Sequence, residues 1–152
     1  MNHWPDRILQ DDESIRAVLQ RTRRIAVLGI KPETRSHKPA FYVPRFLQQA
    51  GYQIVPVPVY YPEVTRILGE PVYRRLVDVP GPVDLVDVFR KPEDIPPHVP
   101  DILASRPAAV WFQLGIRNDE AARELARAGI LVVQDRCLMV EHNRLITHRS
   151  GG

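Results

Sequence analysis

Cys137, Glu141 and His142 are the residues whose types and spacing most resemble a reactive centre. Cys137 and Glu141 lie four positions apart on a predicted helix and therefore share a face, with His142 one position further on. A cysteine near a histidine and a carboxylate can act as a nucleophile or a metal ligand. One thiol beside a single Glu-His pair is not a spaced metal signature, so we interpret Cys137 as a buried helix residue and Glu141 as a structural tie. We expect no metal site and no catalytic residue there.

A second group of reactive side chains lies in the loop between Gly29 and Pro39. Gly29 permits a tight turn and a close approach to phosphate. A helix that starts at Pro39 would direct free N–H groups and partial positive charge towards an anion, and Arg35, His37 and Lys38 add formal charge. Two independent features thus indicate a phosphate-binding loop, the alternative being a solvated connection. A single histidine there is more typical of a phosphate donor than of a base.

Other motifs narrow the kind of phosphate compound. The dinucleotide fingerprint requires three glycines and an acid at the end of the second strand, whereas this loop has Gly29 alone and the strand is followed by Pro58. NAD is therefore disfavoured, and NADP stays open because Arg or Lys can meet a 2′-phosphate. No Walker-type phosphate loop and no Ser-His-Asp set occurs. We expect Asp84 to be structural, Asp87 to lie nearer the ligand edge, and Trp111 and Phe112 to pack in the core.

Five apolar runs, each followed by a helical pattern or a turn, must position these residues. The runs are continuous rather than alternating, which is typical of strands buried on both faces of a parallel sheet. We predict one Rossmann-like α/β domain in three layers, with a five-stranded parallel sheet of order 3-2-1-4-5 and helices on both faces. The predicted strands are 24–29, 52–57, 83–89, 108–114 and 130–133, and the predicted helices are 12–20, 39–49, part of 93–105, 119–128 and 137–145, with a helical turn at 73–77.

Ligands of open α/β sheets bind at the carboxyl ends of the strands, where the strand order reverses. We place that point between the first and fourth strands. Four segments are expected to converge there: 29–38, 56–61, 89–93 and 113–117.

Composition limits the class of protein. A chain of 152 residues fits one domain, here 1–152 with a core at about 12–146. One cysteine excludes an internal disulfide framework, and no signal peptide or apolar stretch long enough for a membrane is present, so we expect a cytoplasmic protein. The net charge of +3 is spread along the chain, which does not favour nucleic-acid binding.

Nearly the whole chain, from about Arg23 to Leu145, resembles the small stand-alone CoA-binding proteins, whose fold is similar to the N-terminal domain of the succinyl-CoA synthetase α subunit. Six runs in the same order carry the resemblance: 25–29, 42–47, 51–57, 83–90, 111–116 and 135–142. One departure is Pro58, where relatives commonly carry asparagine, and it removes a hydrogen-bonding side chain.

The resemblance implies coenzyme A, with or without an acyl group, laid across the carboxyl edge of the sheet. It implies that residues 29–38 hold phosphates, that a second group flanks the adenosine portion and that a third lines the route of the pantetheine arm. The implied residues are Gly29, Ile30, Lys31, Thr34, Arg35, His37, Lys38, Pro39 and Tyr42 for the first segment and its helix, Pro56, Val57, Pro58, Phe89 and Arg90 for the adenosine, and Gln113, Leu114 and Gly115 for the arm.

We therefore expect a CoA-binding protein without catalytic activity of its own, acting as a carrier, sensor or subunit. The larger relatives need a phosphohistidine domain and a nucleotide-grasp subunit, and this chain is too short for either. Two alternatives stay open: a small NADP-dependent oxidoreductase, and an interaction protein that binds no ligand. A homodimer or a partner subunit is compatible with the sequence, and no residue pattern demonstrates it.

Overall fold

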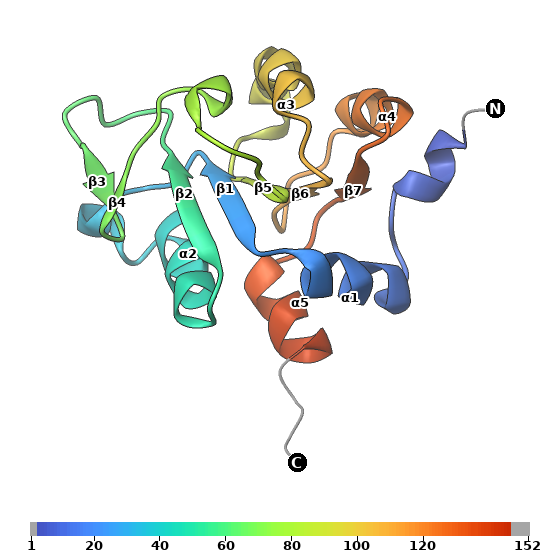
Figure 1. Cartoon of the computed structure of the whole chain (residues 1–152), viewed down its shortest axis with the longest axis horizontal. Coiled ribbons are helices and arrows are strands. Elements are labelled where there is room, and N and C mark those ends of the chain that lie inside the picture. Colours follow the sequence, from blue (N-terminus) through green and yellow to red (C-terminus); the bar gives the residue numbers. More distant parts are fainter. Residues whose placement is uncertain (1–2, 147–152) are drawn as a thin grey trace.

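The apolar runs form five parallel strands in the computed structural model, which describes residues 3–146 (Figure 1). Continuous burial along each strand agrees with a sheet covered on both faces. The strands are β1 (Arg24–Leu28), β2 (Gln53–Val57), β5 (Leu85–Val88), β6 (Ala109–Phe112) and β7 (Leu131–Val133). The predicted α/β fold with a five-stranded parallel sheet is confirmed.

The strands lie in the order β2-β1-β5-β6-β7. The strand predicted third, 83–89, corresponds to β5, and it pairs with β1 instead of lying beyond β2. The place beyond β2 belongs to a short hairpin of β3 (Arg66–Ile67) and β4 (Glu70–Pro71), just after which the Tyr73 N–H donates to the Pro56 carbonyl at 3.0 Å. The hairpin is a two-stranded sheet of its own, so the five-stranded sheet ends at β2, and its strands lie in the order 2-1-3-4-5 when they are numbered as predicted. The strand order reverses between β1 and β5.

Helices cover both faces of the sheet (Figure 1). One layer contains α1 (Asp12–Arg21), α2 (Pro39–Gln49) and α5 (Leu138–Leu145), and the other contains α3 (Val99–Ser105) and α4 (Asp119–Arg127). The 3-10 turns are Trp4–Arg7, Glu33–Arg35, Leu76–Asp78, Pro92–Asp94 and Pro96–His98. The helix predicted within 93–105 is therefore shorter than the pattern allowed, because its prolines interrupt the backbone bonding and leave two separate turns before α3.

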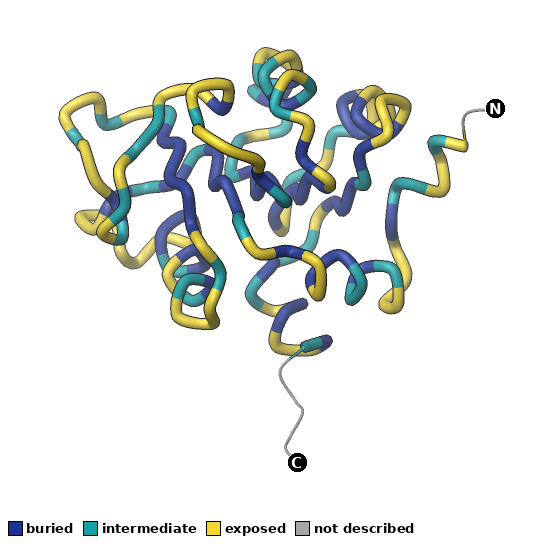
Figure 2. Tube along the Cα trace, in the orientation of Figure 1, coloured by how far each residue is buried: buried dark blue, intermediate teal, exposed yellow. Residues whose placement is uncertain are grey.

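Side chains alternate between two cores, one on each face of the sheet. The strands are mostly buried, whereas the loops and the outer turns of the helices are largely exposed (Figure 2). Ile25 and Val27 pack against α1, α2 and α5, whereas Ala26 and Leu28 pack against α3 and α4. Trp111 and Phe112 are both fully buried, on opposite faces, as predicted. This packing holds the carboxyl ends of the strands in register at one edge of the sheet.

Three polar side chains bond to backbone N–H groups at the ends of elements, and Asp84 among them was predicted to be structural. The Asp11 carboxylate accepts the Ser14 N–H at 2.9 Å and the Asn118 carbonyl oxygen accepts the Ala121 N–H at 3.0 Å, so both cap their helices. Asp84 is structural, because its Oδ2 accepts the backbone N–H groups of Arg23 and Arg24.

The described helices include none that is long and apolar enough to cross a bilayer.

Candidate ligand-binding site

Two adjoining hollows open at the carboxyl edge, where the strand order reverses. The larger has a volume of about 430 Å³ and lies between the segments that follow β1, β5 and β6. The smaller, about 180 Å³, lies between the segments that follow β1, β2 and β5. Both are lined by Lys31, Phe89, Arg90 and Lys91. The shared wall makes them one elongated site, at the position where open α/β sheets bind their ligands.

Gly29 ends β1 and lines the smaller hollow. Its φ of +88° lies in the left-handed region, and a Cβ on this residue would stand 2.3 Å from the Phe89 carbonyl oxygen. The glycine is therefore required by the close approach of the β1 and β5 ends. This steric reason for Gly29 is separate from its predicted role, which is to bring the backbone near a phosphate.

The start of α2 forms one side of the larger hollow through Lys38, Pro39 and Ala40. Pro39 has no N–H, and the N–H groups of Phe41 and Tyr42 both donate to the Lys38 carbonyl, at 2.9 and 3.0 Å. The first three helical residues therefore offer one free backbone donor, the Ala40 N–H. The helix start contributes less to anion binding than the sequence indicated, because its backbone donors are bonded locally.

Lysines are concentrated at this site. The chain contains three, Lys31, Lys38 and Lys91, and all three line the larger hollow. Lys31 is half-buried, while Lys38 and Lys91 are exposed. No described acidic side chain forms an ion pair with any of them. Their charges are therefore available to an anionic ligand.

Arg90 is held in place from several sides. Its Nε donates to His98 Nε2 at 3.2 Å, its NH2 lies 3.8 Å from an Asp94 carboxylate oxygen, and its guanidinium lies 5.5 Å from the centre of the Tyr60 ring. Burial and the neighbouring Arg90 charge lower the pKa of His98. A neutral His98 can accept this hydrogen bond, which leaves the guanidinium positively charged and fixed in the shared wall.

Two tyrosines complete the smaller hollow. Tyr60 is 60% exposed, and Lys31 Nζ lies 5.8 Å from the centre of the Tyr61 ring. Partial burial raises the pKa of the Tyr61 hydroxyl, and the hydrogen bond with Arg35 and the charge of Lys31 outweigh it, so the pKa is lowered overall. Aromatic faces among cations suit a ligand that combines a flat ring with phosphate.

The larger hollow has an apolar wall with one buried polar group. Leu114 is 67% exposed and Ile116 is half-buried beside it. Gln113 is only 4% exposed, and its Oε1 accepts the Leu138 N–H at 3.0 Å. This wall suits an uncharged, flexible chain that carries a few polar groups.

The structure brings most of the sequence-predicted residues to these hollows and leaves the others outside them. Lining residues among them are Gly29, Ile30, Lys31, Lys38, Pro39, Tyr42, Phe89, Arg90, Gln113, Leu114 and Gly115. Thr34, Arg35 and His37 are exposed on the 3-10 turn and the bend after it, and line neither hollow, although Arg35 contacts Tyr61. Pro56, Val57 and Pro58 are buried and line neither.

Several lining residues were not assigned to the ligand individually, although they lie within the segments expected to converge: Val59, Tyr60, Tyr61, Pro92 and Ile116. Ala40 and Asp94 lie outside those segments, and Cys137 was interpreted as a buried helix residue. Exposed aromatic side chains directly after a buried strand were the available signal for Tyr60 and Tyr61. Cys137 is half-buried and stands one residue before α5.

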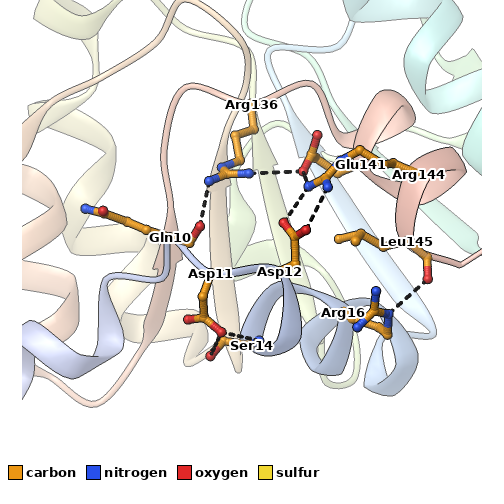
Figure 3. A network of polar contacts seen from close by, with 9 residues as sticks. All are labelled: Gln10, Asp11, Asp12, Ser14, Arg16, Arg136, Glu141, Arg144 and Leu145. Atoms are coloured by element: carbon orange, nitrogen blue, oxygen red, sulfur yellow. Dashed lines mark hydrogen bonds and ion pairs between the residues drawn. The ribbon is translucent and has the colours of Figure 1, made fainter.

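Glu141 belongs to a network that ties α5 to the N-terminal segment (Figure 3). Its Oε1 accepts from Arg136 at 3.1 Å and from Arg144 at 2.7 Å, and Arg144 also pairs with Asp12. His142 contacts Tyr52 through Nδ1 at 3.1 Å. Glu141 and His142 are thus engaged in packing, away from the hollow that Cys137 lines.

The fold is of the Rossmann-like α/β class with a hollow at the carboxyl edge of its sheet, and the comparisons with known proteins narrow this class. Residues 23–143 match the family model described as CoA binding domain. The chain therefore belongs to this family.

Three relatives are similar to this chain over most of its length. The uncharacterized protein YneT of Bacillus subtilis (strain 168) is 36% identical over 130 residues, which are 84% of this chain and 91% of that protein. The protein cell-free ID.343 from Thermus thermophilus is 45% identical, and its structure matches with a TM-score of 0.82 over 90% of this chain and 100% of the other. A hypothetical protein from Pyrococcus horikoshii OT3 is 34% identical, with a TM-score of 0.81 over 90% and 93%.

Proposed function

We propose that this chain binds coenzyme A, free or acylated, across the two adjoining hollows, and that it acts as a carrier, sensor or subunit without chemistry of its own. One observation carries the proposal. All three lysines and the fixed guanidinium of Arg90 line a continuous hollow at the reversal of strand order. CoA carries a diphosphate and a 3′-phosphate, so it needs such charge, and the family match to a CoA binding domain supports it.

The chemistry of the walls suggests how the ligand lies. The smaller hollow, with Tyr60 and Tyr61, suits the adenine ring and the ribose phosphate. The shared wall, with Lys31 and Arg90, suits the diphosphate. The apolar wall of the larger hollow then receives the pantetheine arm, whose thiol lies furthest from the adenine.

The lining residues favour binding over catalysis. Asp94 is the single carboxylate among them, and it pairs with Arg90. Histidine and carboxylate side chains are common general acids and bases, and none is among the described residues that line the larger hollow.

Titration calorimetry with CoA, acetyl-CoA, NADPH and ATP tests this function. We expect CoA and acetyl-CoA to bind with Kd values at least about tenfold below those of NADPH and ATP, a difference of about 1.4 kcal/mol. Binding of NADPH as tight as that of CoA would support the oxidoreductase alternative instead. No ligand tighter than about 1 mM, or roughly −4 kcal/mol, would support an interaction protein.

A further inference from the structure

A third hollow opens at the same edge of the sheet, next to the larger of the two that the proposed ligand occupies. It has a volume of about 370 Å³ and is lined by residues 8–10 of the N-terminal segment, by Arg117 after β6 and by residues 134–136 after β7. Ile8 pairs with Val132 of β7 in parallel, so the residues that follow both positions reach the carboxyl edge together. Most of these side chains are polar, and the proposed position of free CoA does not extend among them.

A thin partition of backbone separates the third hollow from the larger one. Gly115 and Ile116 line the larger hollow, and the next residue, Arg117, lines the third. Asp135 holds the partition from the other side: its Oδ1 accepts the Gly115 N–H at 2.6 Å, and its own N–H donates to the Ile116 carbonyl at 3.1 Å. Gly115 is exposed, and apart from its chain neighbours no atom lies within 4 Å of the place where a Cβ would stand. No side chain therefore blocks the passage between the two hollows at Gly115.

Most hydrogen-bonding groups in the third hollow are already used by the protein. The amide of Gln134 is occupied at both ends, because its oxygen accepts the Asn118 N–H at 2.8 Å and its nitrogen donates to the Asp119 carboxylate at 3.0 Å. The Arg136 guanidinium donates through two of its nitrogens, as Figure 3 shows. These side chains shape the hollow and have little left to offer a ligand.

Arg117 is different, because two of its nitrogens are free. Its Nε lies 3.0 Å from a carboxylate oxygen of Asp119, whereas Nη1 and Nη2 have no hydrogen-bond or ion-pair partner among the described residues. Two neighbouring nitrogens of a guanidinium match the two oxygens of a carboxylate in distance and direction. The third hollow thus presents an unused carboxylate-binding group just beyond the open passage at Gly115.

We propose that the third hollow receives the acyl group of an acyl-CoA and selects a short acyl chain that ends in a carboxylate. This inference rests on the proposed function, because the pantetheine arm is what brings the acyl group to Gly115. The acyl chain is attached to the sulfur at the end of the arm, crosses the partition at Gly115 and directs its carboxylate to Nη1 and Nη2 of Arg117. An uncharged acyl group of the same length leaves this guanidinium without a partner.

Titration calorimetry with two CoA thioethers, which do not hydrolyse as thioesters do, tests the selection. The sulfur carries a carboxypropyl group in one and the neutral carbamoylpropyl group in the other, so the ligands have the same length and shape and differ in charge. Because the Arg117 side chain is 58% exposed, solvent screening limits its contribution. We expect the carboxylate ligand to bind roughly three- to fivefold more tightly than the amide, and Arg117→Gln should abolish this difference.

Arg21→Gln is the matched control, because it removes an equal charge from the exposed end of α1. The preference for the carboxylate should persist in this variant. Equal affinities of the two thioethers for the wild-type protein, or a preference that survives Arg117→Gln, would overturn the selection. Free CoA separates the two proposals: if CoA binds and the thioethers bind equally, the acyl selection alone fails, and if neither CoA nor the thioethers bind, the proposed function fails with it.

Discussion

Replacement of Lys31 by methionine tests where the diphosphate lies. Lys31 lines both hollows, is half-buried, and has no acidic partner among the described residues. A charge-assisted hydrogen bond in such a place contributes about 1.5–3 kcal/mol. Since 1.4 kcal/mol corresponds to about a tenfold change in Kd, Lys31→Met should weaken CoA binding roughly 10- to 150-fold.

Lys38 provides the internal comparison because it lines the same hollow from an exposed position. Solvent screening limits an exposed ion pair to about 1 kcal/mol or less, so Lys38→Met should cost roughly fivefold or less in Kd. Arg21→Met removes one charge at the end of α1, away from the site, and controls for net charge. Calorimetry at fixed salt measures all three. A Lys31→Met effect below about twofold, or one smaller than that of Lys38→Met, would refute the placement.

Three further predictions concern stability and the ligand arm. Gly29→Ala should destabilise the fold by at least about 1–3 kcal/mol, because its Cβ would meet the Phe89 carbonyl at 2.3 Å, and urea unfolding that matches the wild type would contradict this. Burial raises the pKa of Asp87 well above the usual 3.8, so the folded protein keeps a proton that the unfolded chain releases. The free energy of unfolding should therefore fall as pH rises from about 4 through the folded pKa, and Asp87→Asn should lack this fall, whereas parallel pH profiles would count against it. Gln113→Leu should weaken the binding of CoA and leave the binding of adenosine 3′,5′-bisphosphate, which lacks the arm, unchanged in calorimetry. An equal loss of affinity for both ligands would show that Gln113 does not contact the arm.

The strands of the sheet were predictable because their apolar runs are continuous. A short continuous apolar run is typical of a strand that is buried on both faces of a parallel sheet. The hairpin that contains Arg66 and Glu70 was not predicted, since two-residue strands in a proline-rich stretch have no periodic signal. The strand at 83–89 was placed beyond the second strand, whereas it pairs with β1, and the hairpin forms a separate two-stranded sheet.

The location of the candidate site followed from topology, and its detailed lining did not. The rule for strand ends identified the right edge of the sheet, and most lining residues follow β1, β5 and β6. Around β2 the hollow is lined by Val59, Tyr60 and Tyr61, because the hairpin covers the strand end and buries Pro56. Cys137 was interpreted as a buried helix residue, whereas α5 begins one residue later and leaves it half-buried in the wall.

Chemical labelling of lysine gives the most direct test of the central claim, that CoA occupies the hollow lined by Lys31, Lys38 and Lys91. These three residues are all the lysines in the chain. One labelling experiment therefore measures the reactivity of every lysine, and each of them lines the candidate site. With saturating CoA, reductive methylation should slow at all three and most at the half-buried Lys31, while an added lysine-containing peptide reacts at an unchanged rate. Unchanged methylation of Lys31 in the presence of bound CoA would contradict the account.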